Sequence, residues 1–226
     1  MKKPVLLLAL ASLFIFKGAA FAQDHEVDLN QLTNETQIMS DDPDLMQMVW
    51  YIPIEYWKAV FDQDPSISAA DAREVIKALE QYELFSIVDG EIGVFGNIKY
   101  RSERDIRSSL KLTGPDEQVY YALDDSEIDS DAQGMINIFA PLLSNMMGEL
   151  GSNMHFFFFK SKSGRRIAKP KGDGKMVVNL GDEVFDFKFP FGSLMPMKIC
   201  TVTGEERNGA WTYCPFHGVK LVEKKN

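Results

Sequence analysis

The sequence predicts an α+β fold in which helices and antiparallel hairpins share one chain and a small β module ends it. Apolar residues recur at helical spacing over 69–83 and 130–150. They alternate with polar residues over 183–189, as in a half-buried strand. Two short turns that each begin with a cysteine lie within 198–226. A chain of 226 residues can bury a core as one large domain or two small ones.

The first 22 residues have the pattern of a secretory signal peptide. Two lysines precede the apolar run 5–16, and Ala20-Phe21-Ala22 fits a small-residue cleavage site. The alternative is a membrane anchor, which needs about 20 apolar residues. This run is shorter, and no later segment of the sequence is long and apolar enough to span a bilayer. We therefore expect cleavage after Ala22 and a periplasmic or secreted protein.

The rest of the chain divides into three segments. Residues 23–44 are polar and acidic without apolar periodicity, which predicts a flexible acidic leader. Residues 45–197 are expected to form the α+β domain, and 198–226 a separate tail. Signal cleavage would remove three lysines and change the net charge from −9 to −12. Proteins that bind nucleic acids or anionic membranes need positive charge on their surface, so we expect neither as a general partner. The sequence leaves the oligomeric state open.

The N-terminal half of the domain mixes helix and hairpin signals. Ser68 and Asp71 form a capping box for a helix over 69–83. A strand is predicted over 84–89, and Asp89-Gly90 is typical of a two-residue hairpin turn. Four upstream aromatic residues are expected in the core, with a ligand-binding aromatic wall as the alternative: Trp50, Tyr51, Tyr56 and Trp57.

The middle of the domain contains the strongest helical signal. A short helix is predicted from Ser102 to about Leu110. The longer helix over 130–150 is expected to be capped by Ser130, kinked at Pro141 and largely buried. An acidic run precedes it, for which we favour a solvated loop beside the helix N-terminus over a calcium site: Asp124, Asp125, Glu127, Asp129 and Asp131.

The final third of the domain is predicted to be β-structure. Residues 155–159 suit a buried strand, because the segment is apolar on both faces. Strands over 175–180 and 183–189 are joined by Gly181-Asp182, a tight hairpin signal. Three phenylalanines of the second strand share one face, which should point to the core: Phe185, Phe187 and Phe189.

One basic segment stands out in this acidic chain, between the buried strand and the hairpin. It can dock an acidic partner or phosphate groups, or it can be a solvated loop kept mobile by glycines. The solvated loop is the simpler interpretation, since basic loops often serve only solubility. The residues that would contact a partner are Lys160, Lys162, Arg165, Arg166, Lys169 and Lys171.

Sequence motifs for common enzymes are absent. The chain contains no Gly-x-Ser-x-Gly elbow, no phosphate-binding Gly-x4-Gly-Lys-Ser/Thr loop and no Gly-x-Gly-x-x-Gly fingerprint. A Ser/His/Asp or Cys/His triad would need one of only three histidines. His25 lies in the leader, His155 opens a phenylalanine-rich strand, and His217 lies in the tail. We assign no catalytic residue and favour a non-enzymatic protein, with an enzyme of unrecognised type as one alternative.

The tail carries the only two cysteines and resembles a degenerate zinc ribbon. In that family a Cys-Pro-x-Cys-Gly knuckle is followed by Phe/Tyr-Cys-Pro-x-Cys-Gly-x-x-Leu. Here the first half begins at Cys200 as Cys-Thr-Val-Thr-Gly, and the second begins at Tyr213 as Tyr-Cys-Pro-Phe-His-Gly-Val-Lys-Leu. The resemblance implies two facing knuckles that bring Cys200 and Cys214 together. Thr203 replaces one ligand and cannot substitute for it, whereas His217 replaces another and can bind zinc.

Three states of the tail follow from this resemblance. An exported protein meets an oxidising compartment, which favours a disulfide between Cys200 and Cys214. Such a bridge contributes roughly 3 kcal/mol for a loop of about 15 residues and needs no cofactor. The alternative is a zinc site formed by Cys200, Cys214 and His217, since three protein ligands are the count of an open zinc site. Free thiols are the third state, and Met195 and Met197 add soft donors that would suit copper(I).

The body also has a resemblance, although it implies no activity. Its Ile52-Pro-Ile-Glu-Tyr-Trp57 segment resembles one found in exported bacterial proteins of unassigned activity that also end in a ribbon. The favoured function is therefore an exported, non-enzymatic module that binds a protein or other acidic partner and is stabilised by the C-terminal disulfide. A metal-binding protein that uses the Cys/Cys/His tail is the alternative from another class.

Overall fold

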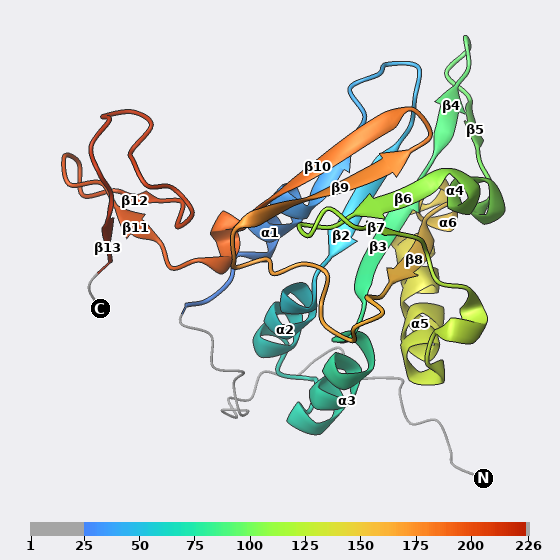
Figure 1. Cartoon of the computed structure of the whole chain (residues 1–226), viewed down its shortest axis with the longest axis horizontal. Helices are drawn as coiled ribbons and strands as arrows, with labels where there is room; N and C mark the ends of the chain where they lie inside the picture. Colours follow the sequence, from blue (N-terminus) through green and yellow to red (C-terminus); the bar gives the residue numbers. More distant parts are fainter. Residues whose placement is uncertain (1–24, 225–226) are drawn as a thin grey trace.

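The computed structural model describes residues 25–224 and confirms the α+β class. The predicted signal peptide lies outside these residues. Two four-stranded antiparallel sheets and a layer of helices form the body, and a small ribbon projects from one end of it (Figure 1). No helix within residues 25–224 is both long enough and apolar enough to cross a membrane.

The first sheet lies in the middle of the body and is covered on both faces. Tyr51 lies opposite Phe85, which in turn lies opposite Phe157, so three aromatic residues cross the sheet in one row. All residues of its two central strands are buried. In spatial order the strands are β1 (Gln37–Met39), β2 (Met48–Ile52), β3 (Glu83–Val88) and β8 (His155–Phe159).

The second sheet covers one face of the first. Phe185, Phe187 and Phe189 are buried against it, which confirms the predicted alternation, and the rings of Phe187 and Phe85 lie 5.9 Å apart. The predicted hairpin at Gly181 is also confirmed, with φ at +61°. In spatial order the strands are β10 (Glu183–Phe189), β9 (Gly174–Leu180), β6 (Leu110–Thr113) and β7 (Val119–Tyr120).

Helices pack against the opposite face of the first sheet, where they bury Trp50, Trp57 and Phe158 in a second apolar cluster. Two predicted helix starts are confirmed, because Ser68 Oγ and Ser102 Oγ each accept a backbone N–H three residues on. The helices of that layer are α2 (Ile54–Gln63), α3 (Ala69–Leu79) and α5 (Ser130–Met147), which continues into α6 (Glu149–Ser152). The remaining helices are α1 (Leu29–Thr36) and α4 (Glu103–Ser109), with 3₁₀ turns at Asp125–Glu127 and Gly192–Leu194.

The predicted flexible leader is wrong for its described residues. Asp28 caps α1 by accepting two backbone N–H groups, and β1 pairs with β2. Val27 and Leu32 are buried in the main core. Because these few apolar side chains face inward while most of the acidic ones are exposed, the overall composition of the segment concealed an element of the core.

The predicted two-residue turn at Asp89-Gly90 is also wrong. Asp89 is buried and accepts a hydrogen bond of 2.9 Å from Gln47 Nε2. The chain continues into β4 (Gly90–Ile92), which pairs with β5 (Ile98–Tyr100). The reversal lies instead at 93–97, where Gly96 has φ of +78°.

The long helix α5 is less buried than predicted, and its expected cap is absent. Ala132 and Leu143 are its buried residues, whereas Ile138 and Leu142 are half exposed and Met146 is 81% exposed. The helix is apolar around much of its circumference, but only one stripe faces the first sheet and α3. The N-cap residue is Asp129, not Ser130, and makes no side-chain capping bond.

Candidate metal centre

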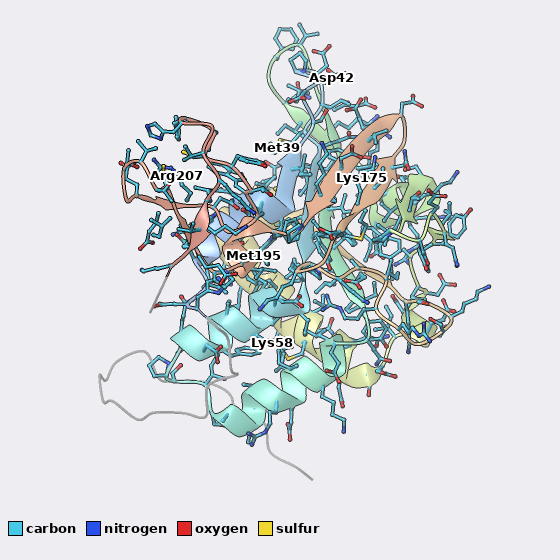
Figure 2. All side chains as sticks on the ribbon, turned by 60° about the vertical axis from the view of Figure 1, so that its left-hand side comes forward. Met39, Asp42, Lys58, Lys175, Met195 and Arg207 are labelled. Atoms are coloured by element: carbon cyan, nitrogen blue, oxygen red, sulfur yellow. The ribbon has the colours of Figure 1, made fainter. Side chains whose placement is uncertain are left out.

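The ribbon is a small sheet in which the central strand pairs with two short neighbours. Its strands are β11 (Lys198–Ile199), which is central, β12 (Glu206–Arg207) and β13 (Val222–Glu223). Met195 lies at the body end of this module and Arg207 within it (Figure 2). Both cysteines are buried, and with Leu221 they form the ribbon's own apolar cluster.

Each cysteine begins a tight turn of the same construction. Gly204 N–H donates to the Cys200 carbonyl at 2.7 Å, and Gly218 N–H donates to the Cys214 carbonyl at 2.8 Å. The two glycines have φ of +72° and +66°, a region that suits residues without a Cβ atom. The chain therefore forms two matching knuckles.

The knuckles bring two thiols and one imidazole together. Cys200 Sγ and Cys214 Sγ lie 3.6 Å apart. His217 Nδ1 lies 3.4 Å from each sulfur, so the three atoms form a nearly equilateral triangle. Together they could hold a metal ion, since their ligand atoms all lie within 4.8 Å of one another. Among the residues that the structure describes, these three side chains form the one such group of three or more histidine, cysteine or acidic residues.

The surroundings of the sulfurs favour their thiolate forms. Burial acts to raise the pKa of Cys214, but hydrogen bonds from the Phe216 N–H, His217 and Arg207 lower it to about 6. Burial likewise opposes ionisation of Cys200, whose pKa is lowered overall by the N–H groups of Thr203 and Val202. Hydrogen bonds to Cys214 and Cys200 raise the pKa of the His217 imidazole.

The expected disulfide is not formed in this structure. Both cysteines are free, and their separation of 3.6 Å exceeds the bond length of about 2.05 Å. The knuckles hold the sulfurs as neighbours of His217 instead of directing them only at each other. The three residues named from the sequence therefore come together as a candidate ligand set.

The fourth corner of the ribbon pattern carries no thiolate or imidazole. Thr203 is exposed, and its hydroxyl donates to Glu205 Oε2 at 3.0 Å. The Arg207 guanidinium forms an ion pair with the same carboxylate and lies 5.2 Å from the centre of the Phe216 ring. One side of the ligand triangle is thus bordered by polar groups and exposed side chains.

The basic segment predicted to dock a partner is not one uniform surface. Lys160 Nζ donates to Gln81 Oε1 at 2.5 Å. Arg166 pairs with Glu55 at 2.8 Å and with the buried carboxylate of Glu83 at 3.5 Å, which gives it a structural role. Four members of the set remain exposed: Lys162, Arg165, Lys169 and Lys171.

Sequence reasoning missed the buried polar network around Glu83. This carboxylate is 1% exposed and accepts hydrogen bonds from Tyr51 Oη at 2.5 Å and the Ala168 N–H at 3.0 Å. Burial, followed by the nearby Glu83 charge, raises the pKa of the Tyr51 phenol well above its ordinary value. No local motif links residues so distant in sequence, and only the tertiary fold brings them together.

A second missed network joins the ribbon to the body. Glu35 in α1 accepts hydrogen bonds from Ser193 N and Oγ at 3.0 and 2.7 Å, and from Asn208 Nδ2 at 3.2 Å. Ser193 also presents its carbonyl to His25 Nε2 at 3.0 Å. His25 therefore lies at this junction, away from the ligand triangle.

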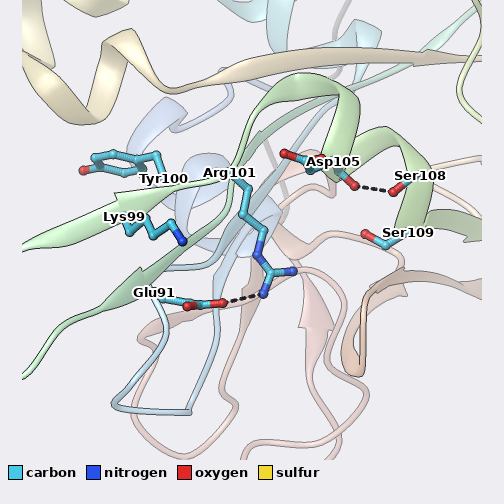
Figure 3. A pocket seen from close by; sticks show the side chains of 7 residues that line it. All are labelled: Glu91, Lys99, Tyr100, Arg101, Asp105, Ser108 and Ser109. Atoms are coloured by element: carbon cyan, nitrogen blue, oxygen red, sulfur yellow. Dashed lines mark hydrogen bonds and ion pairs between the residues drawn. The ribbon is translucent and has the colours of Figure 1, made fainter.

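A polar cleft elsewhere in the body does not form a comparable site. It has a volume of about 370 Å³ and lies between the β4–β5 hairpin and α4 (Figure 3). Arg101 enters it and pairs with Glu91 at 2.9 Å, while Asp105 Oδ2 accepts from Ser102 Oγ at 2.6 Å. Most of its charged groups are therefore already paired within the protein. His155 is half-buried in β8, and burial lowers its pKa.

The chain was compared with family models, curated proteins and solved structures. None of the three comparisons gave a match.

Proposed function

We propose that this protein binds a zinc ion in its C-terminal ribbon, through Cys200 Sγ, Cys214 Sγ and His217 Nδ1. The proposal is carried by the spacing of these atoms. Zinc lies about 2.3 Å from sulfur and about 2.0–2.1 Å from nitrogen, so tetrahedral ligands are separated by about 3.8 Å for two sulfurs and about 3.6 Å for sulfur and nitrogen. The separations here are 3.6 Å and 3.4 Å.

The donor types support zinc over harder ions. Thiolate and imidazole are ligands that zinc prefers, whereas calcium and magnesium select oxygen. Backbone N–H groups beside the sulfurs lower the pKa of both cysteines, which favours the thiolate, the form that coordinates a metal. Metal binding would then order a module that has almost no apolar core of its own.

Zinc content and its dependence on the three ligands test this proposal. The purified protein should hold one zinc per chain by elemental analysis and native mass spectrometry. Cys200→Ser, Cys214→Ser and His217→Ala should each reduce zinc affinity at least tenfold, by analogy with loss of a ligand or its support. Lys220→Ala, an exposed change in the same ribbon, is the matched control and should retain zinc. A wild-type protein with no more zinc affinity than Cys214→Ser would refute the proposal.

A second candidate is an exported, partner-binding protein whose ribbon is closed by a Cys200–Cys214 disulfide. The 3.6 Å separation supports it, because a small approach of the two sulfurs would allow the bond. The N-terminal pattern supports export to an oxidising compartment. Thiol titration of protein recovered from its native compartment tests this candidate. Two thiols that react before reduction would rule it out.

A further inference from the structure

We propose that the zinc site keeps its fourth position for a thiolate supplied by another molecule. This inference rests on the proposed zinc site and specifies what that site binds. Three protein ligands would occupy three corners of the tetrahedron around zinc. The fourth corner is then filled by water or by a ligand from another molecule. The remaining question is which groups of this chain reach the fourth corner.

Within residues 25–224, no further cysteine, histidine or carboxylate joins the three ligand atoms. The chain's only cysteines are the two already used, and its other histidines lie at the body junction and in β8. Thr203 occupies the equivalent knuckle position, but its hydroxyl is a poor zinc ligand and donates to Glu205. Among the described residues, no carboxylate joins the three ligand atoms within 4.8 Å of one another. A second copy of this chain would use its own cysteines in the same way.

Side chains on both knuckles are exposed to solvent, and they include polar and apolar groups. Thr203 and His217 are both exposed. Val202 and Phe216 occupy matching places in the two knuckles and are 59% and 74% exposed.

Charge and donor type select a thiolate. Two thiolates neutralise a divalent ion, so a third gives the centre one negative charge. Arg207 is placed to offset that charge, because its guanidinium lies 5.2 Å from the centre of the ring of Phe216, which is in the same knuckle as Cys214. A third sulfur also matches the soft donors already present. The ligand is therefore a thiol, either a small thiol or a cysteine of a partner protein. Its sulfur would replace the water that otherwise fills the fourth position, and its proton would pass to solvent.

Cobalt(II) in place of zinc makes this proposal measurable, because thiolate-to-cobalt charge-transfer absorption reports the number of bound sulfurs. The full chain, loaded with one cobalt, should respond to 2-mercaptoethanol with a saturable rise of about half in this absorption, as a third sulfur joins two. Thr203→Cys should show the higher absorption without added thiol and should not respond further. Thr203→Val keeps the side-chain size without adding a ligand and should respond as the wild type does.

Two further measurements identify the ligand class and its source. Azide and imidazole in place of the thiol should not reproduce the rise. A peptide with one cysteine between apolar residues distinguishes the sources: saturation at a lower concentration than 2-mercaptoethanol assigns the site to a protein cysteine, and the reverse assigns it to small thiols.

The outcomes separate this inference from the zinc site itself. Failure of the wild type to bind cobalt would refute the site. Cobalt binding with an absorption that no thiol changes would refute the open thiolate position and leave the site intact. If Thr203→Cys fails to fold, the response of wild type and Thr203→Val to added thiol still decides the question.

Discussion

Removal of zinc should unfold the ribbon and leave the body folded. The ribbon's buried cluster consists of Cys200, Cys214 and Leu221, with Val219 packed against it. Burial of one leucine contributes about 1.5–3 kcal/mol. A structural zinc ion supplies about 10–16 kcal/mol in small zinc-finger modules. The metal is therefore expected to dominate the stability of the ribbon, whereas the two sheets of the body share a large aromatic core that contains no ligand.

Hydrogen exchange of the knuckle amides measures this effect directly. The N–H groups of Cys200, Gly204, Cys214 and Gly218 all donate to carbonyls within their own knuckles. Free zinc at 100 times its dissociation constant stabilises the bound form by about 2.7 kcal/mol, which corresponds to about 100-fold slower exchange than in chelator. The amides of β3 are the internal control, because this strand is buried at the centre of the body.

Two results would refute this reasoning. Equal exchange of the knuckle amides in zinc and in chelator would mean that the ribbon is ordered without metal. An equal zinc effect on the β3 amides would mean that the ribbon and the body unfold as one unit. The expected pattern is a large effect at the four knuckle amides and none in β3.

Three substitutions test other parts of the structure. Glu83→Ala should lower the free energy of unfolding by about 3–5 kcal/mol in urea titrations, because it leaves the Tyr51 hydroxyl and the Ala168 N–H buried without an acceptor. A loss under about 1 kcal/mol would contradict this. Gly204→Ala should weaken zinc binding about fivefold, because the φ of +72° at this position strains any residue with a Cβ atom. No other atom lies within 4 Å of the added Cβ, so the effect would come from the backbone alone. Unchanged zinc affinity in calorimetry would exclude that strain. Glu35→Ala should lower the free energy of unfolding by about 1.5–3 kcal/mol and free the ribbon from α1, seen as faster motion in ¹⁵N relaxation; a ribbon as rigid as in the wild type would show that this carboxylate does not anchor it.

The sequence predicted best where local pattern and burial agree. Alternation placed Phe185 and Phe187 on the core face, and turn chemistry placed Gly181 between the strands. The predicted burial of the long helix was wrong. The helix has apolar residues around more of its circumference than the first sheet can cover, so Met146 faces solvent. The prediction of a flexible acidic leader was wrong for the opposite reason. A few inward-facing apolar side chains such as Leu32 are enough to pack this segment into the core.

The candidate site divides in the same way. The resemblance to a zinc ribbon singled out Cys200, Cys214 and His217 as a set, and the structure brings their ligand atoms together. Glu35 is 158 residues from Ser193 in sequence, so nothing local connects them. Arg166 was grouped with the other basic residues because sequence cannot show that Glu83 and Glu55 lie beside it. Long-range polar partners are a property of the tertiary structure.

Zinc and a disulfide are alternative uses of the same two sulfur atoms. A disulfide removes both thiolates and brings the sulfurs about 1.5 Å closer than their present 3.6 Å. It would also leave His217 Nδ1 without the two partners that it now contacts at 3.4 Å. Zinc uses all three groups at the separations that they already have. The position of His217 therefore favours metal over the bridge, since a ribbon closed by a disulfide alone gives no reason for an imidazole equidistant from both sulfurs.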